Sequence, residues 1–131
     1  LGYLRSLLGP RDGLSTLVTM TLGKPADPAL LRPLVESMAS VAHESLHGGL
    51  DAFRTADFGD RIGEIRTPTL VLAGELDAVL PPALLREFVA DKIPGAQLEL
   101  MPGVGHYPHI EIPDELTRRL VEAVTASSTA A

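Results

Sequence analysis

The feature that most constrains this chain is an alternation of strand and helix patterns across residues 67–126. Residues 69–73 (TLVLA) form a short, unbroken apolar run, which is typical of a strand buried on both faces of a parallel sheet. A helical pattern follows at 82–92, alternating polar and apolar residues at 96–101, and a second helical pattern from about residue 113. This order predicts an α/β fold in which helices flank a small parallel sheet of at least two strands.

Each of these predicted elements has a side that should be buried. The alternation at 96–101 places Leu98 and Leu100 on one face of a strand, which indicates a position nearer the edge of the sheet. The spacing of apolar residues also predicts the buried faces of the two helices, namely Leu84, Leu85, Phe88 and Val89 in the first and Leu116, Leu120, Val121 and Val124 in the second.

A long helix is predicted in the N-terminal half of the chain. Pro28 suits the first turn of a helix capped by Asp27, and apolar residues then recur every three or four positions as far as Leu46. The glycines at 48–49 are expected to end this helix, as glycines often do at helix C-termini. A second, short helix is expected over residues 50–55.

The chain is expected to consist of two parts that meet near residue 60. Residues 13–23 fit either a helix or a strand, and their β-branched side chains favour a strand. With that exception residues 1–60 are mainly helical in pattern, whereas residues 61–131 carry the strand and helix alternation. The composition changes near Arg66, just before the first predicted strand.

Composition narrows the classes of function. The chain has 131 residues, 45% of them hydrophobic and 21% charged, as is ordinary for a soluble globular domain. A net charge of −6 argues against binding to nucleic acid or to an anionic membrane surface. There are no cysteines, which excludes disulfides, thiolate metal ligands and a cysteine nucleophile. No apolar run approaches the roughly 18 residues of a membrane span, and these features together favour a cytoplasmic protein.

Two polar side chains follow the two predicted strands. Asp77 lies three residues past Gly74, just beyond the strand at 69–73, and His106 lies between Gly105 and Tyr107, beyond the strand at 96–101. The carboxyl ends of parallel strands meet at one edge of a sheet, so both side chains should project into the same crevice. A histidine that acts as a general base needs a partner that fixes its tautomer and stabilises its charged form, and a neighbouring carboxylate supplies both.

The wider pattern around these residues resembles the final third of an α/β-hydrolase. The stretch RTPTLVLAGELDAVLP, followed by PGVGHYPHIEIPDEL, matches a family pattern in which an apolar strand ends in G-x-x-D, a later strand ends in G-x-G-H, and E-x-P begins the last helix. The positions that carry the match are Gly74, Asp77, Pro81, Gly103, Gly105, His106, Glu111 and Pro113. Taken by itself, Glu111 is expected to be an acid at a helix start, near the positive end of the helix dipole.

The resemblance implies the C-terminal part of a hydrolase core over residues 61–131 and a helical cap or lid over residues 1–60. It implies hydrolysis of a small-molecule ester, lactone or similar carbonyl substrate without a cofactor, with His106 as the base and Asp77 as the acid of a catalytic triad. The family's nucleophile lies on a G-x-S-x-G turn, and no such motif occurs in this sequence. We therefore expect negligible triad catalysis from these residues alone.

Two alternatives stay open. The first alternative is a non-catalytic fragment or pseudoenzyme that associates with itself or with a partner. Because the sequence begins at Leu1 and not at a methionine, we expect either a processed start or a piece of a longer chain. An uncovered sheet edge would favour a homodimer.

The second alternative is a zinc-dependent hydrolase. Residues 43–47 (HESLH) match the H-E-x-x-H pattern, in which two histidines four apart on a helix bind zinc and the glutamate acts as base. No third ligand is evident, although Glu64 and Glu75 are available in principle. We therefore assign no metal ligand.

Gly103 and Gly105 lack the third glycine of a dinucleotide-binding turn, so we assign no nucleotide cofactor either.

Overall fold

The computed structural model describes residues 2–129, and the chain divides into two compact units. The first unit takes the described residues of Leu1–Thr21 and Pro25–Asp57, and the second takes those of Leu22–Lys24 and Phe58–Ala131. The three residues Leu22–Lys24 therefore belong with the C-terminal unit although they lie between two helices of the first. Each unit is described by itself.

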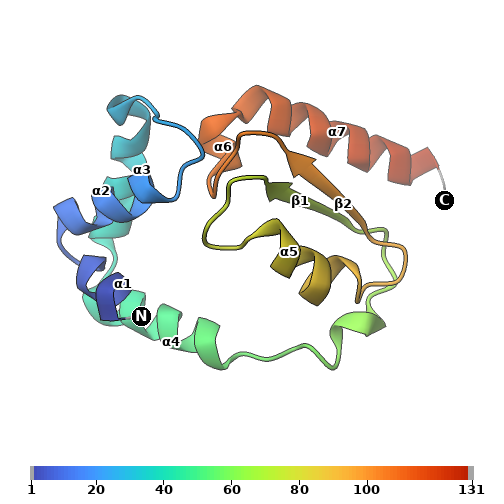
Figure 1. Cartoon of the computed structure of the whole chain (residues 1–131), viewed down its shortest axis with the longest axis horizontal. Helices are drawn as coiled ribbons and strands as arrows, with labels where there is room; N and C mark the ends of the chain where they lie inside the picture. Colours follow the sequence, from blue (N-terminus) through green and yellow to red (C-terminus); the bar gives the residue numbers. More distant parts are fainter. Residues whose placement is uncertain (1, 130–131) are drawn as a thin grey trace. The chain divides into compact units, whose positions relative to one another are not determined.

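The first unit is entirely helical in its regular structure. It contains α1 (Gly2–Leu7), α2 (Arg11–Met20), α3 (Pro28–Ser40) and α4 (His43–Thr55) (Figure 1). Helix α2 packs against α1 and α3. Its Leu14 and Val18, one helical turn apart, are completely buried and form the centre of this unit.

The prediction of a strand over residues 13–23, which the β-branched side chains favoured, is wrong, because most of this segment belongs to helix α2. Packing outweighs local preference here, since the helical spacing of Leu14 and Val18 lets both be buried on one face. Thr16 also fits a helix, because its hydroxyl donates to the carbonyl oxygen of Asp12 at 2.8 Å.

The long helix begins as predicted but ends earlier. Asp27 caps α3, with its Oδ1 accepting a hydrogen bond from the backbone nitrogen of Ala29 at 2.8 Å. The helix stops at Ser40, and Val41 is extended with ψ of 137°. Helix α4 then continues through the glycines at 48–49, which were expected to end a helix. Glycine is permitted inside a helix at a modest cost in stability, so these two positions are poor guides to a boundary.

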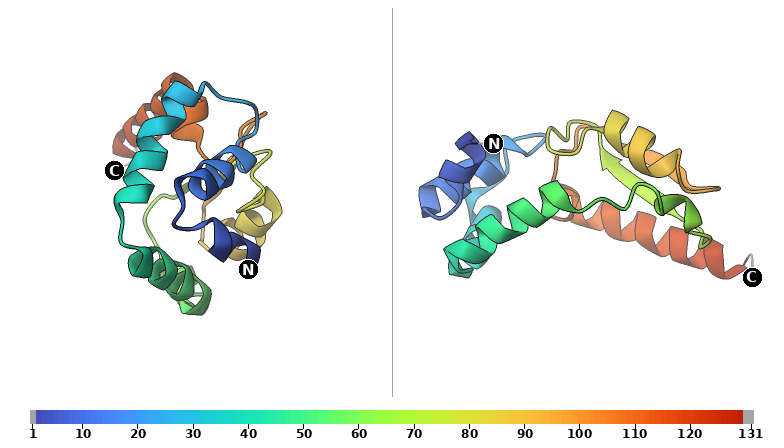
Figure 2. Two further views of the ribbon diagram at one scale, coloured as in Figure 1. Left: turned by 90° about the vertical axis from the view of Figure 1, so that its left-hand side faces the viewer. Right: turned by 90° about the horizontal axis from the view of Figure 1, so that it is seen from below.

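The second unit has two strands with helices on either side. Strands β1 (Leu70–Gly74) and β2 (Gln97–Met101) pair in parallel, with Leu70 opposite Gln97 and Gly74 opposite Met101. The other elements, in chain order, are the single turn η1 (Ile62–Glu64), α5 (Pro82–Leu85), its wider continuation η2 (Arg86–Ala90), α6 (Pro108–Glu111) and α7 (Pro113–Thr129). Helices α5 and α7 lie on opposite sides of the strand pair (Figures 1 and 2). The predicted parallel α/β arrangement is confirmed.

The core of this unit is small. Ala73, Met101 and Val104 are each at most 2% exposed, and they gather where the two strands end. The predicted buried faces of the helices are only partly correct, because several of their apolar side chains are 44–66% exposed: Leu84, Phe88, Leu120, Val121 and Val124, together with Leu100 of β2. Two strands about 5 Å apart are no wider than one helix, so they bury only a narrow strip of each.

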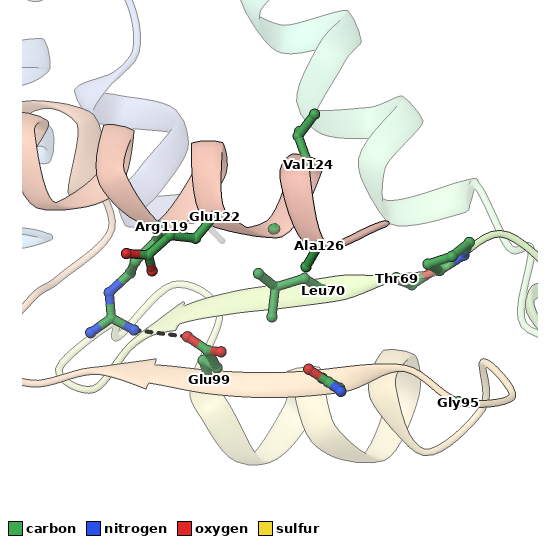
Figure 3. Close-up of a pocket in the computed structure, with 11 residues that line it drawn as sticks. Thr69, Leu70, Gly95, Glu99, Arg119, Glu122, Val124 and Ala126 are labelled. Atoms are coloured by element: carbon green, nitrogen blue, oxygen red, sulfur yellow. Dashed lines mark hydrogen bonds and ion pairs between the residues drawn. The ribbon is translucent and has the colours of Figure 1, made fainter. Parts of the chain in front are cut away.

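An open groove of about 800 Å³ lies between α7 and the amino ends of the strands. Figure 3 shows Leu70 and Glu99 facing α7, where Arg119 binds Glu99 at 2.9 Å. The groove is lined by Leu70 and Gln97, the residues at which the two strands begin. It is therefore at the opposite end of the strands from Asp77 and His106.

None of the helices described in the structure is both long enough and apolar enough to cross a membrane.

Candidate active site

The site lies where the two strands end. Gly74 and Met101 are paired at the last position of the sheet, so the loops that follow β1 and β2 leave it side by side. The backbone nitrogen of Glu75 donates to the carbonyl oxygen of Met101 at 3.0 Å, and that of Leu76 donates to Val104 at 2.8 Å. These bonds extend the contact between the two chain segments beyond the strands.

Asp77 is held in the first of these loops by its own side chain. Its Oδ1 accepts hydrogen bonds from the backbone nitrogens of Val79 at 2.8 Å and Leu80 at 2.9 Å. This is the local turn that aspartate favours, because a short carboxylate can reach the backbone two and three residues ahead. The side chain is only 8% exposed, and its second oxygen is directed towards the neighbouring loop.

The structure brings Asp77 and His106 together. His106 Nδ1 lies 2.9 Å from Asp77 Oδ2, across 29 residues of sequence. The imidazole is 28% exposed, whereas the carboxylate is almost covered. Because Nδ1 is engaged with the carboxylate, Nε2 is the atom available for exchanging a proton with a reactant. This is the arrangement that a histidine base and its orienting acid require.

The environment keeps Asp77 ionised. Burial is the largest single influence on the pKa of Asp77 and raises it, but the hydrogen bonds from His106, Leu80 and Val79, together with the electrostatic attraction of His106, outweigh it. The net pKa of Asp77 lies below its ordinary value of 3.8. A carboxylate that is charged at neutral pH can fix the tautomer of His106 and stabilise its imidazolium form.

The loop that carries His106 is packed closely against the end of β1. A Cβ atom at Gly74 would collide with the carbonyl oxygens of Val104 and Gly105, so only glycine lets the two backbones approach this closely. Gly103 has a φ of +68°, a conformation that other residues rarely adopt. Gly74 and Gly103, the first glycines of the G-x-x-D and G-x-G-H patterns, therefore each have a direct structural reason.

Sequence analysis missed the role of two carboxylates that hold this loop. Glu111 accepts hydrogen bonds from the backbone nitrogens of Gly105, Tyr107 and Gly23. Glu75 accepts one from Gly103 at 2.9 Å. The E-x-P spacing did single out Glu111, but only as an acid at a helix start. Side-chain bonds to distant backbone atoms leave no periodic pattern, so the sequence could not reveal them.

The two histidines of HESLH lie on one face of α4, as helical spacing predicts. Their Nε2 atoms are 3.1 Å apart. Of the acids considered as a third ligand, Glu64 pairs with Arg61 and Glu75 binds the nitrogen of Gly103. Among the residues that the structure describes, no three or more His, Cys, Asp or Glu side chains form a group that could hold a metal ion. A catalytic zinc site needs three protein ligands, so the zinc hypothesis gains no support.

Comparisons with known proteins place the chain in a family. The sequence model of the alpha/beta hydrolase fold family matches residues 42–113, more than half of the chain. The pimeloyl-acyl-carrier-protein methyl ester esterase of Yersinia enterocolitica is 31% identical over 118 residues, which cover 86% of this chain and 45% of that enzyme. Its counterpart from Photorhabdus laumondii is 31% identical over 109 residues, covering 81% and 41%. The chain thus spans less than half the length of these relatives.

Solved structures agree with this result. An esterase from Exiguobacterium antarcticum superposes with a TM-score of 0.81 over 88% of this chain and 42% of that one, and at 21% identity this likeness speaks for the fold alone. A thermophilic esterase from Thermogutta terrifontis is 28% identical, with a TM-score of 0.67 over 76% of this chain and 37% of that one. By its sequence, its parallel strand pair and these matches, the chain belongs to the alpha/beta hydrolase fold family.

Proposed function

We propose that this chain supplies the acid and the histidine of a catalytic triad in a hydrolase that acts on a carboxylic ester, a lactone or a similar carbonyl substrate. The observation that carries the proposal is the 2.9 Å contact between Asp77 and His106 at the carboxyl ends of the strands. Parallel sheets place their reactive groups at this edge. The exposed fraction of the imidazole, 28%, leaves it open to a reactant.

In the proposed reaction, His106 Nε2 takes a proton from a nucleophile as that group attacks the carbonyl carbon of the substrate. The imidazolium then returns the proton to the departing alcohol, and a covalent acyl intermediate is left on the nucleophile. A water molecule, deprotonated by His106 in the same way, then attacks the acyl intermediate, and the carboxylic acid product is released from the nucleophile. Asp77 fixes the tautomer and stabilises the imidazolium throughout. The nucleophile lies outside these 131 residues, since the sequence has no G-x-S-x-G motif.

The names of similar proteins support an ester as the substrate class. The two relatives described above are methyl ester esterases, and the solved Thermogutta structure, at 28% identity, is that of an esterase. We extend to this chain only the chemistry that these names share, hydrolysis of a carboxylic ester. By the family resemblance, the N-terminal helices would form the cap over the substrate.

Hydrolysis of a short-chain nitrophenyl ester tests the proposal in two proteins. One is this chain alone, for which we expect no turnover above buffer. The other is a chimera in which the N-terminal part of the Yersinia esterase, which by the family resemblance carries the nucleophile, is joined ahead of Leu1. We expect the chimera to hydrolyse the ester, and His106→Ala to lower kcat/KM by roughly 10³-fold or more.

His109→Ala provides the matched control. His109 is an exposed histidine three positions further along the chain, on α6, and its replacement should leave turnover unchanged. Equal activity in the wild-type and His106→Ala chimeras would reject the proposal. That result would favour the alternative of a non-catalytic chain that associates through its uncovered surfaces.

A further inference from the structure

One carboxylate binds the backbone on both sides of the candidate base. Glu111 Oε1 accepts hydrogen bonds from the backbone nitrogens of Tyr107 at 3.1 Å and Gly105 at 3.0 Å. Glu111 Oε2 lies 3.0 Å from the same Gly105 nitrogen. Gly105 and Tyr107 are the immediate neighbours of His106, so one side chain holds the peptide unit that follows His106 and the peptide unit that precedes Gly105, one on each side of the imidazole.

A third donor comes from far away in the sequence. The backbone nitrogen of Gly23, 88 residues before Glu111, donates to Glu111 Oε2 at 2.9 Å. Gly23 also lies directly against the histidine loop, because a Cβ atom there would come within 2.5 Å of the Gly103 oxygen and 2.6 Å of the Gly105 nitrogen. This contact explains why Leu22–Lys24 belong to the second unit.

The negative charge of Glu111 suits this arrangement better than a neutral amide would. Three backbone N–H groups point at two oxygens, and hydrogen bonds to a carboxylate are about twice as strong as those between neutral groups. A glutamine has only one oxygen, and its NH₂ group would face at least one of the backbone donors. The loop thus depends on charge as well as on shape.

The other side of the loop is held by the end of β1. Val104 accepts a hydrogen bond from Leu76 at 2.8 Å, and Gly74 leaves room for the carbonyl oxygens of Val104 and Gly105. Asp77 is part of this same segment. The loop is therefore fixed between the segment that carries the acid and the carboxylate of Glu111, which sets the distance from Asp77 to His106.

We propose that Glu111 is a positioning residue for His106, and that its charge is required to hold the imidazole against Asp77. The catalytic consequence rests on the proposed function, whereas the positioning itself is a property of this chain. A simpler role would be to cap α6 alone, as a glutamate in a capping box bonds to the backbone nitrogen of the N-cap residue, which for α6 is Tyr107. In that role only the bond to Tyr107 would matter.

Nuclear magnetic resonance of the full chain separates these roles. The readouts are the amide exchange rates of Gly23, Gly105 and Tyr107, and the resonance of the proton between His106 Nδ1 and Asp77. In Glu111→Gln we expect exchange of at least one of these amides to rise roughly tenfold, the effect of one lost hydrogen bond. We also expect the Nδ1 proton to broaden through faster exchange with water. An unchanged Nδ1 proton would overturn the proposal and leave Glu111 as a cap.

Glu75→Gln is the matched control. Glu75 binds Gly103 in the same loop, but Gly103 does not adjoin His106. We expect faster exchange at Gly103 and an unchanged Nδ1 proton. If the control broadened the Nδ1 proton as much as Glu111→Gln does, the specific role of Glu111 would be refuted.

Two further variants keep the test decisive. If Glu111→Gln does not fold, Glu111→Asp takes its place, because it keeps the charge but is too short to reach all three donors. Wild-type exchange and an unchanged Nδ1 proton in Glu111→Asp would count against the proposal. Asp77→Asn should abolish the Nδ1 resonance. If the resonance persists in Asp77→Asn, the acid–histidine pair itself is absent, and the proposed function fails rather than the positioning alone.

Discussion

The two carboxylate oxygens of Asp77 make different contacts. Oδ1 organises the turn through Val79 and Leu80, and Oδ2 binds His106. Removing the side chain leaves these donors without an acceptor, and because they are only partly buried each costs less than the about 1–3 kcal/mol of a fully buried unsatisfied donor. Substitution of Asp77 therefore affects both stability and the candidate chemistry, and the two effects must be measured separately.

The lowered pKa of Asp77 predicts how stability changes with pH. Because the folded chain holds the proton more weakly than the unfolded chain does, the contribution of Asp77 is fully present above its ordinary pKa of 3.8 and is lost as pH falls through the lower folded value. Denaturant unfolding of the wild type and Asp77→Asn between about pH 5 and pH 3 measures this. We expect a steeper loss of stability with acid in the wild type. Equal slopes would contradict the assignment.

At the scale of elements, helix α4 shows where local pattern misleads. The glycines at 48–49 lie inside the helix, and a Cβ atom at either position would meet nothing within 4 Å. Neither has the positive φ that a glycine at a helix C-terminus commonly adopts. The structure and the sequence pattern therefore predict opposite effects of adding a methyl group here.

Gly48→Ala should stabilise the chain by about 0.5–1 kcal/mol, because alanine favours the helix and has open space around it. Gly74→Ala is the contrasting variant, and it should destabilise by more than about 1 kcal/mol because its Cβ would overlap the oxygens of Gly105 and Val104. Denaturant unfolding of both variants checks the pair of predictions. A loss of stability in Gly48→Ala would support a helix end at this point instead.

The elements that could be predicted from sequence are those with a local cause. The apolar run at 69–73 and the alternation at 96–101 predict β1 and β2 to within one residue, and Asp27 with Pro28 predicts the start of α3. The pairing of Asp77 with His106 followed because parallel strands bring their carboxyl ends together. The role of Glu111 could not be predicted, since it depends on Gly23, which only folding brings near.

At the scale of the whole molecule, the described part of the chain has an uncovered strand edge and an uncovered apolar helix surface. Within the described residues β1 pairs only with β2, so its other edge has no strand partner. Three of the four apolar residues of α7 that were expected to be buried, Leu120, Val121 and Val124, remain exposed. A sheet of two strands cannot cover them, and the chain spans less than half the length of relatives such as the Yersinia esterase.

We expect the chain alone to self-associate through this strand edge and the apolar side of α7, because unpaired backbone groups and adjoining apolar side chains both favour association. Light scattering over a range of protein concentrations measures this. Dimers or larger species should form as the concentration rises. A stable, monodisperse monomer at every concentration would contradict the prediction.

The central claim is that Asp77 and His106 act as one unit in ester hydrolysis, and a double-mutant cycle in the chimera tests it most directly. The measurement is kcat/KM for the wild type, Asp77→Ala, His106→Ala and the double variant. Residues that act as a unit have non-additive effects, so we predict that the double variant is about as slow as His106→Ala alone. If instead the two losses multiply, each residue acts independently, and the account is contradicted.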